Sequence, residues 1–327
     1  MAQQCGFELA GITPALPVEP DATQFLNWVS RGLAGRMSYL TDRRADLRTD
    51  PRSLLPGAQT VICLGRLYNT PDSGPIARYA RSEDYHQALR RDLEALVVAL
   101  QQEFGPFEYK LCIDTAPLLE RSYARVAGLG WIGRNTCLIN ESLGSYVFLA
   151  EILISLDLGL PTQSAPDRCG TCTRCIDACP TQAIVSGGLR TELDATRCIS
   201  YLTIELKGAV PEQLRPLMGN LAFGCDICQE VCPWNRKAPF VANPAGTAPD
   251  LAALATLSPA EFLTMFRNTP VWRTKYQGLL RNVAVALGNG RDPGHKSTLY
   301  ALAQSEDDVI RSHAEWALHQ IEQEISA

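Results

Sequence analysis

The sequence has little that would export the chain or anchor it in a membrane. Its first residues, MAQQCGFELAG, lack the basic start and the apolar core of a secretory signal. No apolar run reaches the length that spans a bilayer. Acidic residues also outnumber basic ones, so the net charge over 327 residues is −5. We therefore expect a cytoplasmic protein, in which any nucleic-acid partner must meet a local basic patch.

Two patterns resemble known cofactor-binding motifs but lack a feature that each motif requires. The glycines of Gly128-x-Gly130-x2-Gly133 follow a helical stretch instead of a strand, so the context of the dinucleotide-binding fingerprint is missing. Crowding of the backbone against a flat cofactor is another reason for such glycines. Asp84-Tyr85-His86 begins like the DxHxxG pattern that places a histidine below the cobalt of cobalamin, but Leu89 stands where the glycine belongs. A capping aspartate and a partly buried histidine are the favoured interpretation.

Cysteine, in contrast, is abundant and clustered. Eight of the twelve cysteines form the series Cys169-x2-Cys172-x2-Cys175-x3-Cys179-Pro180, Cys198, and Cys225-x2-Cys228-x3-Cys232-Pro233. This is the spacing of a bacterial ferredoxin, in which three thiolates of a run hold one cluster and the fourth crosses to the other. Disulfide frameworks are typical of small secreted domains, and zinc would need two pairs of cysteines per site, so both alternatives fit poorly.

The crossing rule divides the eight thiolates into two sets of four. Cys232 takes the crossing position of the second run, and the lone Cys198 completes the remaining set. The first 4Fe-4S cluster is predicted on Cys169, Cys172, Cys175 and Cys232, and the second on Cys179, Cys198, Cys225 and Cys228. The other four cysteines, Cys5, Cys63, Cys112 and Cys137, are expected to be small apolar core residues.

The chain divides into three parts by pattern. Residues 1–165 mix strand-like and helical segments, which indicates a covered sheet. Joins rich in proline and glycine separate this part from a cluster-binding part, 166–237, and a helical tail, 238–327. In the first part, strands are expected at 60–65, 109–113 and 145–156, and a helix at 85–100.

The tail contains one internal echo. Leu280-Arg281-x2-Ala284-x2-Leu287 returns thirty residues later as Ile310-Arg311-x2-Ala314-x2-Ala317. Short helices that repeat at such periods build α-solenoids, and an ordinary helical cap is the alternative.

Several stretches together resemble one family. They are Asp50-Pro51-Arg52-Ser53-Leu54-Leu55-Pro56-Gly57-Ala58, Asp84-Tyr85-His86, Asp114-Thr115-Ala116-Pro117, Gly130-Trp131-Ile132-Gly133-Arg134-Asn135, the eight cysteines and Arg197-Cys198-Ile199-Ser200-Tyr201-Leu202-Thr203-Ile204-Glu205. The chain resembles epoxyqueuosine reductase in all of them. The resemblance implies an α+β protein with a nitroreductase-like cobalamin-binding domain, a ferredoxin-like domain with two 4Fe-4S clusters and a short α-helical, HEAT-like tail. It also implies reduction of epoxyqueuosine to queuosine at the wobble position of tRNA, the last step of queuosine biosynthesis.

The resemblance also assigns site residues. It implies that Asp114 lies over the corrin and donates the proton, although a helix cap before Leu118 is favoured by the residues alone. It further implies a cobalamin site lined by Arg48, Leu138, Ser200 and Asp226, with Ala77 at a cobalt-facing position where some relatives carry cysteine. Because Ser200 and Asp226 adjoin Cys198 and Cys225, the second cluster would be the one next to cobalamin.

Partners follow from the same resemblance. The first cluster would accept electrons from an external low-potential donor such as flavodoxin or ferredoxin, and we expect a monomer. The tRNA is expected to meet a basic stretch that a solvated helix face would also explain. Its residues are Lys207, Arg267, Arg273, Lys275 and Arg281. A corrinoid reductive dehalogenase and a plain ferredoxin-type electron carrier are the alternatives, and the long flanking sequence speaks against the carrier.

Overall fold

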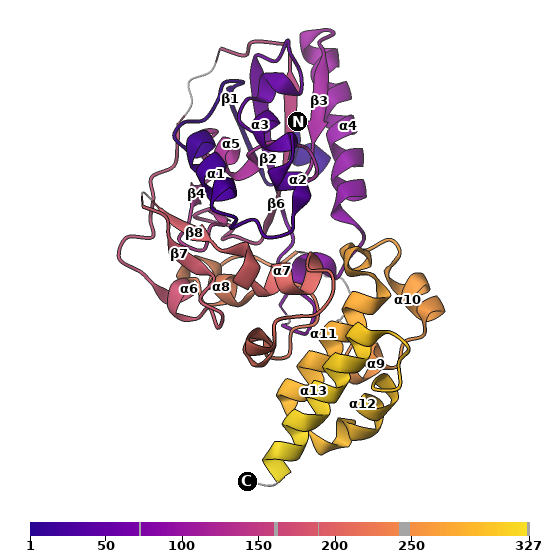
Figure 1. Cartoon of the computed structure of the whole chain (residues 1–327). Helices are drawn as coiled ribbons and strands as arrows, with labels where there is room; N and C mark the ends of the chain where they lie inside the picture. The colour runs from indigo at the N-terminus through magenta and orange to yellow at the C-terminus, as the bar shows by residue number, and fades with distance from the viewer. Residues whose placement is uncertain (72, 160–162, 189, 242–248, 326–327) are drawn as a thin grey trace.

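A four-stranded antiparallel sheet forms the centre of the first part of the chain (Figure 1). The computed structural model describes residues 1–71, 73–159, 163–188, 190–241 and 249–325. The expected strands at 60–65, 109–113 and 145–156 are confirmed, and the sequence did not reveal the first strand. In spatial order the strands are β1 (Leu9–Pro14), β2 (Thr60–Leu67), β6 (Val147–Ile154) and β3 (Tyr109–Cys112).

Helices cover both faces of this sheet, so its central strands are apolar on both sides. The expected helix at 85–100 is confirmed as α4 (Tyr85–Phe104), and its Leu89 and Leu93 pack with Ile62 of β2. Val61, one residue earlier in β2, points to the opposite face and packs with Tyr123 of α5 (Glu120–Val126). This alternation is what the two-residue period of a strand requires. Three shorter helices, α1 (Asp21–Ser30), α2 (Ser38–Thr41) and α3 (Arg44–Leu47), lie between β1 and β2 in the chain.

The glycines of the 128–133 stretch serve the chain's own packing. A Cβ at Gly130 would lie only 2.1 Å from the carbonyl oxygen of Ile139, in the small hairpin of β4 (Trp131–Ile132) and β5 (Leu138–Ile139). Gly128 has φ +83°, a left-handed conformation that glycine adopts without strain. The explanation by crowding against a flat cofactor is therefore corrected to crowding against the neighbouring backbone.

The cysteine-rich part is built from short elements that dock below the sheet (Figure 1). Trp28 of α1 donates from Nε1 to the carbonyl oxygen of Leu193 at 2.7 Å, and Arg190 lies 3.5 Å from Asp21, so this part is tied to the first. Its elements are α6 (Arg174–Asp177), the hairpin of β7 (Ile184–Ser186) and β8 (Thr191–Leu193), α7 (Ile199–Ile204) and α8 (Ile227–Glu230).

The tail is helical, as expected, and shares its core with the cysteine-rich part. Leu202 of α7 and Phe223 lie in the same apolar cluster as Leu280 and Ala284 of α11. The two copies of the internal echo fall on α11 and α13, which pack against each other. The tail helices are α9 (Leu251–Ala255), α10 (Pro259–Phe266), α11 (Lys275–Gly290), α12 (Lys296–Leu302) and α13 (Asp308–Ile325). Among the described residues, no helix is both long enough and apolar enough to cross a membrane.

Candidate functional site

The first predicted set of four thiols lies together. Burial and the neighbouring thiols of Cys169, Cys232 and Cys172 raise the pKa of the Cys175 thiol to about 11. Cys169 and Cys232 also share an apolar cluster with Trp131. Pairing of the first run with the crossing cysteine of the second run is thus compatible with the fold, and iron binding there remains a prediction.

The second predicted set also lies together. Burial raises the pKa of the Cys225 thiol to about 12, and the thiols of Cys198 and Cys179 contribute to this rise. A hydrogen bond with Cys137, burial and the thiols of Cys225 and Cys198 raise the pKa of Cys228.

Among the described residues, no group of three or more His, Cys, Asp or Glu side chains is placed to hold a metal ion.

Cys137 differs from the expected core cysteine. Its thiol hydrogen-bonds that of Cys228, a predicted ligand of the second cluster, and this bond lowers the pKa of Cys137. Cys63 and Cys112 are fully buried, as expected. Cys137 is therefore placed beside the cluster segment instead of within the sheet core.

Asp114 stands where two cavities meet. The first cavity, of about 390 Å³, and the second, of about 550 Å³, both have Asp114 and Tyr39 in their walls. The helix-cap interpretation of Asp114 is wrong, because α5 begins only at Glu120 and Leu119 precedes it without a side-chain cap. Asp114 instead lies in the loop that follows β3, with φ 47°, an uncommon conformation for a residue other than glycine.

His86 joins Asp114 to a second carboxylate. Its Nδ1 lies 2.7 Å from Asp84 Oδ1, and its Nε2 lies 3.3 Å from Asp114 Oδ2. Asp84 caps α4, as expected, by accepting from the His86 N–H at 3.0 Å. The ring is partly buried, as predicted, but it also belongs to the candidate site, which the sequence did not indicate. With a carboxylate at each ring nitrogen, His86 has no free nitrogen for a metal.

The charges around Asp114 favour its ionised form. Burial would raise the pKa of Asp114, but the hydrogen bond and charge of His86, together with Arg273, outweigh it and lower this pKa. Burial opposes protonation of His86, yet its bonds to Asp114 and Asp84 raise the pKa of the imidazole. Both shifts favour the ion pair of His86 with Asp114, whose hydrogen bond offers a path for a proton.

A second pair of carboxyls lies behind Asp114. Glu120 Oε1 accepts from the Asp114 N–H at 2.5 Å. Burial and the nearby charge of Asp114 raise the pKa of Glu120 to about 8. Glu151 of β6 is fully buried, neither of its carboxyl oxygens has a hydrogen-bond partner, and burial raises its pKa strongly. No sequence pattern singled out either residue.

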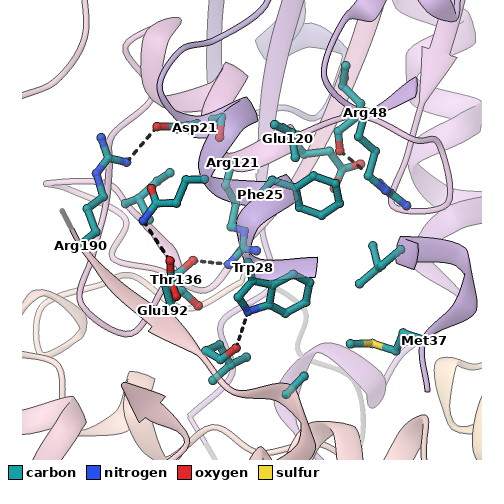
Figure 2. A pocket seen from close by; sticks show the side chains of 18 of the residues that line it. Asp21, Phe25, Trp28, Met37, Arg48, Glu120, Arg121, Thr136, Arg190 and Glu192 are labelled. Atoms are coloured by element: carbon teal, nitrogen blue, oxygen red, sulfur yellow. Dashed lines mark hydrogen bonds and ion pairs between the residues drawn. The ribbon is translucent and has the colours of Figure 1, made fainter. Parts of the chain in front are cut away.

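The first cavity has the lining that a large, flat cofactor needs. Figure 2 shows Phe25, Trp28 and Met37 in its wall, with Arg48 close to Glu120. Arg48 is 5% exposed and donates to the carbonyl oxygen of Ala116 at 3.2 Å, but its Nε has no partner. An apolar, aromatic wall with an unsatisfied buried donor fits cobalamin, whose periphery carries amide groups.

The other predicted cobalamin residues lie near the second set of thiols. A Cβ at Gly224 would meet the Cβ of Ala77 at 2.6 Å, and Asp226 accepts from the Arg78 N–H at 2.8 Å. The Ser200 side chain hydrogen-bonds the Cys198 thiol, and Leu138 follows Cys137 in β5. Ala77, Leu138 and Asp226 are buried. None of these four lines either cavity described above, so their contact with cobalamin remains a prediction.

One of the predicted tRNA contacts requires correction. Arg281 is 1% exposed, and its guanidinium donates to the carbonyl oxygens of Leu202, Leu206 and Gly208. It therefore stabilises the junction of the tail with the cluster segment and does not face a phosphate.

Arg273 lies in the wall of the second cavity. Its Nε is 2.9 Å from Glu205 and its Nη1 is 3.7 Å from Asp114, so carboxylates already balance its charge. Three of the predicted residues are exposed: Lys207, Arg267 and Lys275. Partial burial lowers the pKa of Lys207, and the nearby charges of Lys275 and Arg273 contribute to this shift. These three exposed residues and Arg273 remain candidates for contact with tRNA.

Comparisons with known proteins agree with this arrangement. Residues 168–235 match the family model described as a 4Fe-4S double cluster binding domain, and residues 48–115 match that described as epoxyqueuosine reductase QueG, DUF1730. An epoxyqueuosine reductase of Xanthomonas campestris pv. campestris is 42% identical over 98% of this chain and 94% of that relative.

Solved structures match over the same extent. A crystal structure of epoxyqueuosine reductase with an epoxyqueuosine-modified tRNA-Tyr stem loop has 31% identity and a TM-score of 0.88, covering 98% of this chain and 88% of its own. The Bacillus subtilis enzyme, with its catalytic aspartate loop swung out of the active site, has 30% identity and a TM-score of 0.88 over the same shares.

The chain is thus a mixed helix and strand protein that carries a 4Fe-4S cluster-binding domain. Its similarity to the named relatives extends over nearly the whole length. The chain belongs to the epoxyqueuosine reductase family.

Proposed function

We propose that this chain reduces epoxyqueuosine to queuosine in tRNA with the help of cobalamin and of two 4Fe-4S clusters, the clusters being bound by the two sets of thiols. The observation that carries the proposal is the position of Asp114, hydrogen-bonded to His86 at the junction of the two cavities. Removal of the epoxide oxygen as water consumes two electrons and two protons. Cobalamin, when bound, supplies the reductive cleavage of the carbon–oxygen bond.

The chain's own residues would supply protons and position. The modified base enters the second cavity, where Arg273 and Glu205 present a matched pair of charges beside Asp114. Asp114 gives a proton to the opening epoxide oxygen, and His86 replaces it through the hydrogen bond at Nε2. The residues proposed to hold cobalamin are Arg48, Ala77, Leu138, Ser200 and Asp226. Both ring nitrogens of His86 already contact carboxylates, so no histidine is proposed below the cobalt.

The finer description of the fold is also part of this proposal. Residues 1–165 are proposed as a nitroreductase-like domain, 166–237 as the ferredoxin-like domain and 238–327 as a HEAT-like tail. An external flavodoxin or ferredoxin would reduce the first cluster in a monomeric, cytoplasmic enzyme. The alternative, a corrinoid reductive dehalogenase, has less support because the relatives that match almost the full chain are epoxyqueuosine reductases.

Turnover and iron content test the proposal together. Reduced protein with cobalamin should convert an epoxyqueuosine-containing stem loop to queuosine, seen as loss of one oxygen from the nucleoside mass. Anaerobic reconstitution should give about eight irons per chain. Cys198→Ser should lower the iron content toward half, whereas Cys5→Ser, outside the cluster pattern, should leave it unchanged. An unaltered nucleoside after full cofactor loading would overturn the proposed activity, and a plateau at half the iron in the wild type would remove the second cluster.

A further inference from the structure

Asp114 is held by a contact that the reaction itself does not require. Its side chain serves His86, while its backbone N–H donates to Glu120 Oε1. The φ of 47° at Asp114 is costly for a residue with a Cβ, so this backbone conformation needs support from its surroundings. Glu120, the first residue of α5, provides that support from the wall of the first cavity.

The charges that face Glu120 come from every neighbouring element. Arg48 of α3's C-terminal end and Arg121 of α5 are the cations, and Asp114 is the anion in the adjoining loop. Glu151 of β6 lies on the sheet face that α5 covers, where it is paired in register with Cys63 and Cys112. The buried Glu151 has no hydrogen bond of its own, so Glu120 alone of the two carboxyls contacts the Asp114 loop.

We propose that Glu120 is a positioning residue for the reaction: its carboxyl oxygen fixes the Asp114 N–H and thereby keeps the loop 113–117 in the conformation that presents the Asp114 carboxyl to His86. This inference rests on the proposed role of Asp114 as proton donor. The Asp114 N–H is held by Glu120 and the Ala116 carbonyl by Arg48, and loss of such contacts can release the loop. In the Bacillus subtilis relative the catalytic aspartate loop is seen swung out of the active site.

The test compares two substitutions that differ only in the acceptor. Glu120→Gln keeps the Oε1 acceptor, whereas Glu120→Leu keeps bulk and removes it. Loss of one hydrogen bond should speed hydrogen exchange at the Asp114 amide about fivefold in the leucine variant, and the glutamine variant should exchange like the wild type. Neither substitution should unfold the chain, because Glu120 is only partly buried and lies in the wall of the first cavity. If the leucine variant does not fold, Glu120→Ala makes the same comparison.

Kinetics separate positioning from a general structural effect. A misplaced carboxyl should lower kcat in the Glu120→Leu variant by about 10- to 100-fold and leave KM for the modified stem loop unchanged, with rescue by glutamine. Glu151→Gln is the matched control, because it alters a buried carboxyl of the same layer that does not touch the loop. Equal exchange in the leucine variant and the wild type would overturn the inference, as would a glutamine variant that behaves like leucine. Exchange is measured without cofactor or substrate, so failure of the proposed activity would leave this result interpretable.

Discussion

Asp114 and His86 act as a pair at the scale of single residues. The imidazole lies between two carboxylates, and although burial opposes it, their hydrogen bonds and charges raise the pKa of His86. Burial alone would raise the pKa of Asp114, but the hydrogen bond and charge of His86, together with Arg273, outweigh burial and lower this pKa. We therefore propose that Asp114 and His86 together, and not Asp114 alone, act as the acid.

Asp114→Asn should separate proton transfer from structure. Asparagine keeps a polar side chain of the same size, so the variant should fold and retain iron and cobalamin. It cannot accept a proton from His86 and deliver it, so turnover of epoxyqueuosine should fall by about two to four orders of magnitude. Single-turnover assays on the modified stem loop measure this. Turnover at the wild-type rate with intact cofactors would mean that another group or water gives the proton.

The sequence identified Asp114 only through resemblance, and it could not identify Glu120. An aspartate before a proline and a helix fits a cap equally well, and only the fold shows that α5 starts six residues later. The cysteine sets were predictable because the spacing of ligands in a short segment restricts which sulfurs can meet. Contacts such as that of Arg273 with Glu205 join residues far apart in the chain, and no local pattern encodes them.

At the scale of elements, α13 depends on a neutral histidine. His313 is fully buried, its Nε2 accepts from the Val210 N–H at 3.1 Å, and its Nδ1 is 2.6 Å from the carbonyl oxygen of Val309. Burial and the charge of Arg215 lower the pKa of His313 to about 4. This contact ties α13 to the segment that follows α7.

Acid should therefore weaken the tail. The unfolded chain binds a proton at His313 near pH 6.5 and the folded chain only near pH 4, so the stabilisation is complete above the first value and is lost as pH falls to the second. It amounts to about 3 kcal/mol. Urea unfolding monitored between these pH values should show this slope in the wild type and a flatter one in His313→Gln. His319→Gln, at an exposed position of the same helix, should keep the wild-type slope. Equal slopes in both variants would contradict the assignment.

At the scale of the whole molecule, we propose that a few exposed cations recruit tRNA to an acidic protein. Lys207, Arg267 and Lys275 are exposed near the second cavity, whereas Arg281 is buried. Sequence reasoning could list the basic residues of the tail but could not say which face outward. The buried one serves carbonyl groups instead of phosphates.

Salt dependence should distinguish the two kinds of cation. Replacing Lys207, Arg267 and Lys275 with glutamine should weaken tRNA binding and flatten the plot of log affinity against log salt by about 0.7 to 0.9 per lost contact. Arg90→Gln with Lys110→Gln removes two exposed cations of the sheet domain and should leave the slope unchanged. Arg281→Gln should lower the midpoint of unfolding, because it leaves buried carbonyl groups without a hydrogen-bond donor. The folded fraction of this variant should keep the wild-type dependence of tRNA affinity on salt. An unchanged slope in the triple variant would place the tRNA elsewhere.

The apolar cluster shared by α7 and α11 has a consequence for how the polypeptide can be divided. A fragment ending near residue 237 would expose Leu202 and Phe223 to water and would also lack Arg273, which pairs with Glu205 across the cavity wall. The tail is thus not a separable domain, because it completes the wall of the second cavity, in which the base would react. Removing the tail would therefore leave an aggregation-prone protein with an incomplete cavity. Because the tail packs against the cluster segment, we also expect the proposed tRNA-contacting residues to keep a fixed distance from the reacting groups.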